Sequence, residues 1–192
     1  PHLFSSAASD VYKRQITDKF ELNCKILPMS DNLVSTKIKT SNGKLLDFQE
    51  YFVELKSVPE ISDVIYSESE KAKITKEVSN ALDQADKIVV GPSNPILSIG
   101  PILAIQNLKE KLTNSSSTYV VSPFIENKAI KGPSKKNFED LGYKSDITGI
   151  KEFYNNIGNY YIVQSGDTDK AENTIEKNIL FKSTEDSTNL AR

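Results

Sequence analysis

Lys87-Ile88-Val89-Val90-Gly91-Pro92-Ser93-Asn94-Pro95 decides the fold, because a short β-branched run passes straight into a tight loop of glycine and proline. Residues of helical character follow and end near Leu112. A strand, a tight loop and a helix make up the front half of a βαβ unit. The stretch therefore predicts a strand of a parallel sheet with a helix packed against it.

The same pattern recurs further along the chain. Runs at 118–123 and 160–163 are each followed, after a loop, by residues of helical character. A last short strand is expected at 179–181, before a helix at 184–192 that Thr184 is placed to cap. Strands that alternate with helices favour an α/β fold, with a mostly parallel sheet and helices on both faces.

An added β-hairpin is expected before this repeat. Alternation over 34–40 puts every second residue on one face, and Asn42-Gly43 follows directly. Asn-Gly between two extended runs is the strongest short hairpin signal, because both residues tolerate positive φ. Residues 45–55 are then the returning strand.

Two further elements complete the predicted order. The apolar run 25–29 indicates a strand that ends in the polar loop Ser30-Asp31-Asn32. Between Glu68 and Asp86, apolar residues fall at helical spacing with charged residues on the remaining face.

Composition favours a single domain with a small-molecule partner. The chain has 192 residues, 38% of them hydrophobic, which suits one compact core. Its 24 basic and 26 acidic residues leave a formal net charge of −2, so neither a nucleic-acid surface nor a polybasic membrane surface is expected. No apolar run approaches the roughly 20 residues that span a bilayer.

Cys24 is the single cysteine of the chain. An internal disulfide framework is therefore excluded, which fits a reducing cytoplasm. As a small hydrophobe near a predicted strand, Cys24 is expected in the core.

Residues 1–15 are expected to be an artefact rather than native protein. Asp10-Val11-Tyr12-Lys13-Arg14-Gln15 can be written back as GAT GTG TAT AAG AGA CAG, the end of a sequencing adapter, and such segments are left out of fold reasoning. The native domain is then 16–192, without its N-terminal part. His2 is the only histidine, so catalysis has to use carboxylates, hydroxyls, lysines, backbone amides or a metal.

The loops that end the strands hold the candidate site, because ligands of open α/β sheets collect at the carboxyl ends of the strands. In the loop after the 87–91 strand, Ser93, Asn94 and Ser98 offer small polar groups suited to phosphate oxygens, and Gly100 lets backbone come close to a ligand. A turn in which Asn94 satisfies backbone and Ser98 caps a helix explains these residues equally well.

Three other segments are candidates. Lys128, Lys131 and Gly132 follow a strand and are suited to a diphosphate, although solvated loop lysines are the plainer alternative. Asp31 is the first carboxylate after its strand, and is either a ligand for Mg²⁺, a proton acceptor, or a turn residue. Alternation over 48–52 aligns aromatic side chains, as ordinary strand packing or as a platform for a flat ring.

In order and spacing, these segments resemble the 2-phospho-L-lactate transferase family of coenzyme F-420 biosynthesis over residues 16–192. The segments that carry the resemblance are Ile26-Leu27-Pro28-Met29-Ser30-Asp31, Phe48-Gln49-Glu50-Tyr51-Phe52-Val53, Gly91-Pro92-Ser93-Asn94-Pro95 with Ser98-Ile99-Gly100-Pro101-Ile102-Leu103, Ser122-Pro123 with Lys128-Ala129 and Gly132-Pro133, and Leu141-Gly142.

The resemblance implies a Rossmann-like fold and a Mg²⁺-assisted reaction. The enzyme would move 2-phospholactate from lactyl-diphosphoguanosine to the terminal ribityl hydroxyl of the deazaflavin FO, releasing GMP and forming the F-420-0 precursor. Backbone amides, lysines and a metal can carry such a transfer without histidine. A homodimer is implied as well. The donor acid, lactate or enolpyruvate, stays open.

The same resemblance assigns roles to single residues. The diphosphate and guanosine would lie against Ser93, Asn94, Ser98, Gly100, Lys128, Lys131 and Gly132. The deazaflavin would lie against Met29, Ser30, Phe48 and Glu50. Asp31 would be the catalytic and metal-binding carboxylate. The family's glycine-rich first loop is not found before Ile16, so the chain by itself is expected to be inactive.

Two rival functions stay open. Related regulatory proteins of the gluconeogenesis-factor group share the glycine–proline loop but bind nucleotide sugars, which would make the chain a binding module. A structural α/β domain without a ligand leaves the glycine–proline strand ends unexplained.

Overall fold

The computed structural model describes residues 24–115, 117–125, 128–129, 132–155, 157–167, 172–181 and 183–191. The expected artefact at 1–15, with His2, lies outside these residues.

A four-stranded parallel sheet forms the centre of the molecule, with strand order β4-β5-β8-β9. Its strands are β4 (Ile88–Val90), β5 (Thr118–Val121), β8 (Tyr160–Gln164) and β9 (Thr174–Lys177). The first three were expected from the β-branched runs, and their parallel pairing confirms the predicted α/β fold.

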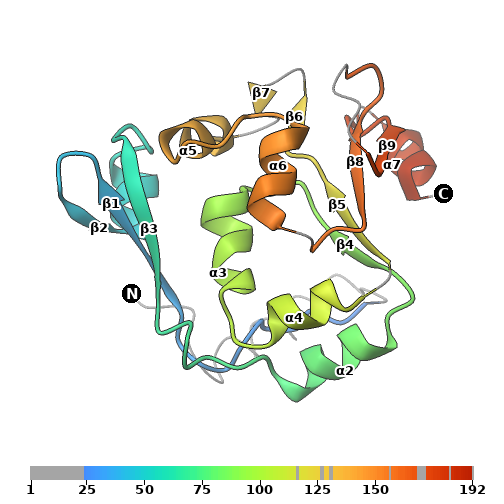
Figure 1. Cartoon of the computed structure of the whole chain (residues 1–192), viewed down its shortest axis with the longest axis horizontal. Helices are drawn as coiled ribbons and strands as arrows, with labels where there is room; N and C mark the ends of the chain where they lie inside the picture. The colour runs from blue at the N-terminus through green and yellow to red at the C-terminus, as the bar shows by residue number, and fades with distance from the viewer. Residues whose placement is uncertain are drawn as a thin grey trace.

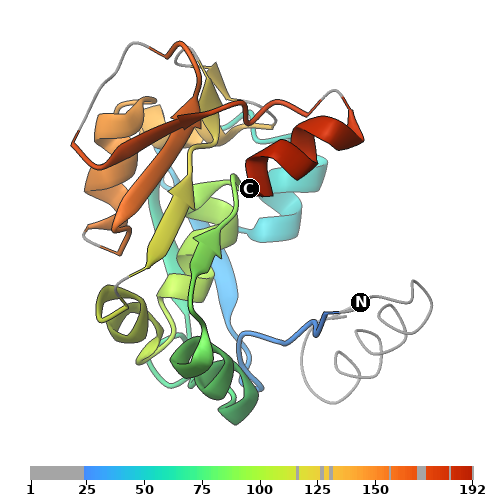
Figure 2. The same ribbon diagram turned by 90° about the vertical axis from the view of Figure 1, so that its right-hand side faces the viewer.

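Helices flank this sheet. Figures 1 and 2 show α3, α4 and α6 on one face and α7 on the other side of β9. The helical elements are α2 (Lys76–Gln84), η2 (Pro95–Ile99), α3 (Gly100–Leu103), α4 (Leu108–Thr113), α5 (Ser134–Asp140), α6 (Ile147–Tyr154) and α7 (Thr184–Ala191). Val120, Tyr161 and Val163 face a continuous apolar core under these helices.

A separate antiparallel sheet lies on the other side of α3 and α6 from the parallel one (Figure 1). It has the order β2-β1-β3, with β1 (Ser35–Thr40), β2 (Leu45–Asp47) and β3 (Ile61–Ser67). The predicted hairpin is confirmed, although Gly43 alone of the Asn-Gly pair has positive φ, at +83°. The Asn42 side chain instead accepts hydrogen bonds from the Thr40 hydroxyl and the Lys44 amide.

The strand expected at 45–55 is wrong beyond Asp47. Residues 48–54 are helical, and Glu50–Glu54 form η1, a turn of π-helix. The alternation that suggested a strand also places Phe48 and Phe52 four residues apart, which is the helical spacing. Their rings stack with centroids 5.3 Å apart.

Two other predicted strands do not form. Residues 25–29 are not extended in a sheet, and the following loop is tied to the Lys73 backbone by Ser30 and Asn32. The last strand lies at β9 rather than at 179–181, because Ile175 pairs with Ile162, whereas Phe181 stays exposed. Cys24, expected in the core, is also exposed.

The remaining differences concern element boundaries. The 68–86 helix is shorter, because Thr75 caps α2 by accepting from the Val78 amide. The helix expected to reach Leu112 is broken between α3 and α4, where Asn107 has positive φ. Three strands were not expected: β3, β6 (Phe124–Ile125) and β7 (Lys128–Ala129).

At α7 the cap is Ser183 rather than Thr184. The Ser183 hydroxyl accepts from the Asp186 amide, and the Asp186 carboxylate accepts from the Ser183 amide. This reciprocal pair is a capping box, which satisfies amides that the helix itself leaves unpaired.

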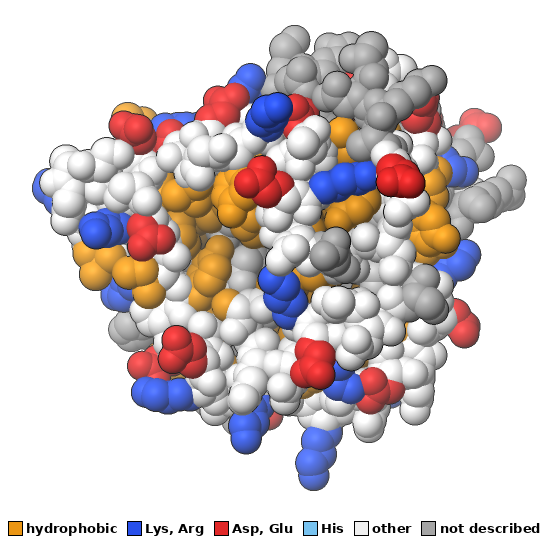
Figure 3. All heavy atoms as spheres, in the orientation of Figure 1, with side chains coloured by type: hydrophobic (Ala, Val, Ile, Leu, Met, Phe, Trp, Pro, Cys, Tyr) orange, Lys and Arg blue, Asp and Glu red, His pale blue; other side chains and the backbone are white. Residues whose placement is uncertain are grey.

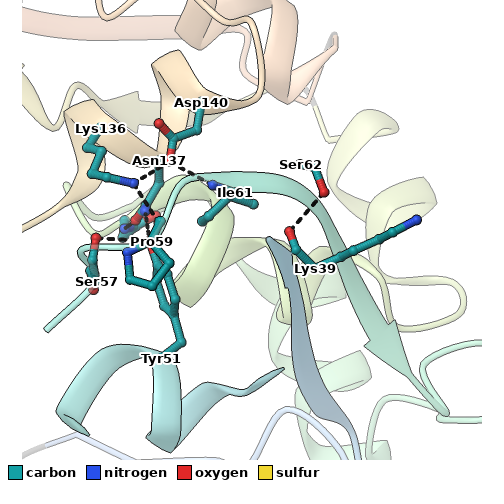
Figure 4. Close-up of polar contacts among 10 residues, drawn as sticks. Lys39, Tyr51, Ser57, Pro59, Ile61, Ser62, Lys136, Asn137 and Asp140 are labelled. Atoms are coloured by element: carbon teal, nitrogen blue, oxygen red, sulfur yellow. Dashed lines mark hydrogen bonds and ion pairs between the residues drawn. The ribbon is translucent and has the colours of Figure 1, made fainter. Parts of the chain in front are cut away.

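Helix α5 joins the two sheets. The Asp140 carboxylate accepts from the Ile61 amide at 2.9 Å and pairs with Lys136, whose ammonium also donates to the Pro59 carbonyl at 2.8 Å (Figure 4). Ile61 is fully buried at the start of β3. The antiparallel sheet is thus held to the parallel unit by partly buried polar contacts.

We expect Asp140→Ala to lower the free energy of unfolding by about 1–3 kcal/mol, because the Ile61 amide and Lys136 lose their acceptor in a partly buried place. Lys135→Ala removes the neighbouring ion pair with Glu139, in which both side chains are about half exposed. This change should lower the free energy of unfolding by less than about 1 kcal/mol. Urea denaturation of both variants measures the difference. Equal losses would show that this anchor adds nothing beyond a surface ion pair.

Candidate functional site

The loop after β4 is built around the side chain of Asn94. Its carbonyl oxygen accepts from the Ile96 and Leu97 amides, both at 3.0 Å, at the start of η2. Pro95 stands at the first position of that helix, where a missing N–H costs nothing. Asn94 therefore satisfies backbone amides, as the plainer interpretation of the sequence proposed, but Asn94 rather than Ser98 is the residue that caps a helix.

The amide nitrogen of Asn94 begins a series of hydrogen bonds that continues through Asn137, Tyr51 and Ser57, three residues that Figure 4 labels. It donates to the Asn137 carbonyl oxygen at 2.9 Å, and the Asn137 amide donates to the Tyr51 hydroxyl at 2.9 Å. The Tyr51 hydroxyl in turn donates to the Ser57 carbonyl at 3.3 Å. Asn137 and Tyr51 have no exposed surface.

The protonation of Tyr51 suits this arrangement. Burial raises the pKa of Tyr51, and the hydrogen bond from Asn137 offsets part of this rise. The phenol therefore stays protonated at neutral pH and can both accept from Asn137 and donate to the Ser57 carbonyl.

The structure leaves two predicted hydroxyls of this loop at the surface. Ser93 and Ser98 are both exposed, on either side of the cap made by Asn94. Gly91 is exposed as well, and an added Cβ there would meet nothing within 4 Å. All three residues are thus open to solvent.

Gly100 has a structural role rather than the predicted contact with a ligand. It is buried, and a Cβ at this position would lie 2.0 Å from the Tyr66 hydroxyl. Tyr66, from β3, donates from that hydroxyl to the Ile96 carbonyl at 2.6 Å. Burial raises the pKa of Tyr66, so its hydroxyl stays protonated and can donate this hydrogen bond.

The second predicted loop lies at the same end of the sheet. Lys128 is in β7 and pairs with Ile125 of β6, and Gly132 has a left-handed φ of +69° just before α5. Because α5 carries Asn137, this loop and the Asn94 loop are joined through one helix. Lys131 lies outside the described residues.

The aromatic segment is also brought to this place. Phe48 and Glu50 are half-buried, and Phe52, stacked on Phe48, is 43% exposed. Tyr51 lies on the same helical turn, and its hydroxyl is bound by Asn137, which also binds Asn94. Figure 3 shows hydrophobic side chains in a band across the upper half of this view of the molecule.

Met29, Ser30 and Asp31 are not brought to this place. The Ser30 hydroxyl donates to the Lys73 carbonyl at 2.6 Å, and Lys73 pairs with Gln106, which follows α3. Asn94 stands at the other end of the helical run 95–103, roughly 13 Å long. The exposed Asp31 therefore lies at the far end of this run from the Asn94 loop.

A magnesium site is not assembled by the described residues. Within the described ranges there is no group of three or more His, Cys, Asp or Glu side chains that could hold a metal ion. Asp31, the carboxylate expected to bind Mg²⁺, is away from the loop. Because Mg²⁺ is also held by one or two carboxylates together with substrate phosphates, the expected Mg²⁺ requirement stays a prediction.

Tyr51, Asn137 and Tyr66 were missed as residues of this region. Asn137 could have been noticed, because asparagine is disfavoured inside helices and its place in α5 calls for a partner. Nothing in the sequence indicates that Tyr66 packs on Gly100.

An open parallel α/β sheet flanked by helices, with polar and glycine-containing loops at its strand ends, defines a Rossmann-like protein. The family model that matches residues 6–189 is described as 2-phospho-L-lactate transferase CofD. The chain belongs to this family.

Curated relatives agree with this assignment. The 2-phospho-L-lactate transferase of Methanocaldococcus jannaschii is 36% identical over 178 residues, which cover 89% of this chain and 57% of the relative. That of Methanococcus vannielii is 38% identical over 185 residues, covering 91% and 59%. The chain therefore spans somewhat more than half the length of these relatives.

Solved structures support the fold. A Bacillus halodurans protein described as a member of the upf0052 family, solved twice, matches with TM-scores of 0.58 and 0.55 at 17% identity. The match with the higher score covers 82% of this chain and 48% of the other. No helix in the described part of this chain is long and apolar enough to cross a membrane.

Gly100→Ala should lower the free energy of unfolding by about 1–3 kcal/mol, because the new methyl group overlaps Tyr66 and the Pro95 carbonyl. Gly91→Ala, in the same loop with open space around it, should change stability by less than about 0.5 kcal/mol. Thermal and urea unfolding test both. A fully stable Gly100→Ala variant would contradict the close packing of β3 on this loop.

Proposed function

We propose that this chain is the part of a 2-phospho-L-lactate transferase that binds the diphosphate of the donor and one face of the acceptor. One observation carries the proposal: the Asn94 loop at the end of β4 is joined through Asn137 to the aromatic turn at 48–54. Two segments suited to different ligands are thus held at one place. Membership of the family supplies the reaction type.

The donor would be lactyl-diphosphoguanosine and the acceptor the deazaflavin FO. The terminal hydroxyl oxygen of FO attacks the phosphorus that bears lactate, and the bond from that phosphorus to the GMP oxygen breaks. GMP leaves with the bonding electron pair, the hydroxyl loses its proton, and a phosphodiester remains. Positioning and charge neutralisation carry most of such a transfer.

The surface groups of the loop would hold the donor. The Ser93 and Ser98 hydroxyls can donate to phosphate oxygens. Lys128 and Lys131 would add positive charge, and Gly132 would let backbone approach the diphosphate. The Phe48–Phe52 pair, with Phe52 43% exposed, would offer an apolar side to the flat ring of FO.

Several expectations stay predictions. They are the catalytic and metal-binding role of Asp31, the Mg²⁺ requirement, the contacts of Met29 and Ser30 with FO, the homodimer and the cytoplasmic location.

Ligand choice separates the transferase from a nucleotide-sugar-binding regulator. A ligand at about one hundred times its Kd stabilises the folded chain by about 2.7 kcal/mol. We expect guanosine diphosphate and FO each to raise the melting temperature in a thermal shift assay, and UDP-glucose to leave it unchanged. Stabilisation by UDP-glucose alone would favour the regulator.

The loop hydroxyls supply a second test. Ser93→Ala and Ser98→Ala should each weaken the binding of guanosine diphosphate by about 1 kcal/mol, roughly a fivefold rise in Kd. Ser62→Ala is a matched control, because Ser62 is an exposed serine on β3 that donates to the Lys39 carbonyl. Isothermal titration calorimetry measures all three. An unchanged Kd in both loop variants would exclude this loop as the phosphate site.

A further inference from the structure

The hydrogen bonds that link Ser57, Tyr51, Asn137 and Asn94 all run in one direction. Each of the last three side chains donates one bond and leaves an oxygen to accept the next. The Ser57 carbonyl can only accept, so the Tyr51 hydroxyl donates its proton there. The oxygen of Tyr51 then accepts from Asn137, whose own oxygen is left to accept from Asn94. The Asn94 oxygen is thereby turned towards the Ile96 and Leu97 amides.

Without the Tyr51 hydroxyl, the order is held only from the Asn94 end, by the Ile96 and Leu97 amides, and the Asn137 nitrogen is left without its acceptor. The side-chain amide of Asn137 could then rotate so that its nitrogen faces the nitrogen of Asn94, two donors without an acceptor between them. Rotation of Asn94 would in turn place its nitrogen against the Ile96 and Leu97 amides. The helix cap would be lost, because a cap needs an acceptor at this position.

The backbone beside Tyr51 is strained where the chain of hydrogen bonds begins. Lys56 and Ser57 both have positive φ, at 50° and 57°, a region that residues other than glycine avoid. Ser57 is buried, and its amide donates to the Tyr51 carbonyl at 2.9 Å while its carbonyl accepts from the Tyr51 hydroxyl. Such strain persists only where the surrounding contacts hold it.

We propose that Tyr51 and Asn137 are positioning residues of the candidate site, which set the orientation of the Asn94 side chain and so the shape of the loop that receives the donor phosphates. The inference rests on the proposed function for the identity of the ligand. Neither residue touches the ligand in this arrangement, since both are fully buried. They hold the donor loop and the aromatic turn at a fixed spacing.

Tyr51→Phe is the most direct test, because it removes one oxygen and keeps the ring. Amide hydrogen exchange, followed by NMR, compares Ile96 and Leu97 with Val120, whose strand lies in the centre of the sheet. A loss of global stability alone would lower protection at all three amides by one factor. We expect protection at Ile96 and Leu97 to fall about tenfold more than at Val120.

Ser62→Ala serves as the control, because it removes an exposed hydroxyl on β3 that lies outside this series of hydrogen bonds. It should leave the exchange ratio and the Kd for guanosine diphosphate unchanged, whereas Tyr51→Phe should raise that Kd about tenfold. Asn137→Leu, if it folds, should match Tyr51→Phe in the exchange ratio. Should it not fold, Tyr51→Phe still decides the question.

The two proposals fail in different ways. If the parent chain does not bind guanosine diphosphate, the proposed function is contradicted, and the exchange ratio alone decides the positioning role. Equal loss of protection at Ile96, Leu97 and Val120 in Tyr51→Phe would overturn the positioning role, whether or not the parent chain binds the nucleotide.

Discussion

The buried amide of Asn137 is the contact on which the arrangement of the site depends. An amide without exposed surface has to satisfy both its oxygen and its nitrogen inside the protein, because an unpaired polar group in a dry region is costly. Its oxygen takes a hydrogen bond from the loop after β4, and its nitrogen gives one to the aromatic turn. The loop after β4 and the aromatic turn, more than 40 residues apart in sequence, are thereby both fixed to α5.

The rest of α5 strengthens the same connection. Lys136 and Asp140, on either side of Asn137 in the sequence, bind the backbone at the start of β3. Further along, β3 brings Tyr66 against Gly100 and the Ile96 carbonyl. The antiparallel sheet thus reaches the loop after β4 by two routes, one through α5 and one through Tyr66. A ligand bound to this loop would meet a surface that both sheets hold in place.

The parallel strands could be predicted from sequence because their signals are local. β-Branched runs that end in glycine or proline mark β4, β5 and β8, and Asn42-Gly43 marks the turn between β1 and β2. β3 could not be found in this way, because a shift in register opposite Lys39 and Thr40 breaks the alternation of its apolar residues. The turn at 48–54 was misjudged because aromatic residues four apart fit a helix as well as one face of a strand.

The candidate site shows a different limit. The order of the loops along the chain predicted which segments hold polar groups, and the Asn94 loop and the aromatic turn do meet, through Asn137 of α5. The expected position of Asp31 depended on a strand at 25–29 ending at the same edge of the sheet. That strand does not form, and Ser30 and Asn32 bind the Lys73 backbone instead. A strand end can be placed in space only when its pairing partner is known, and pairing is a long-range property that a single sequence does not carry.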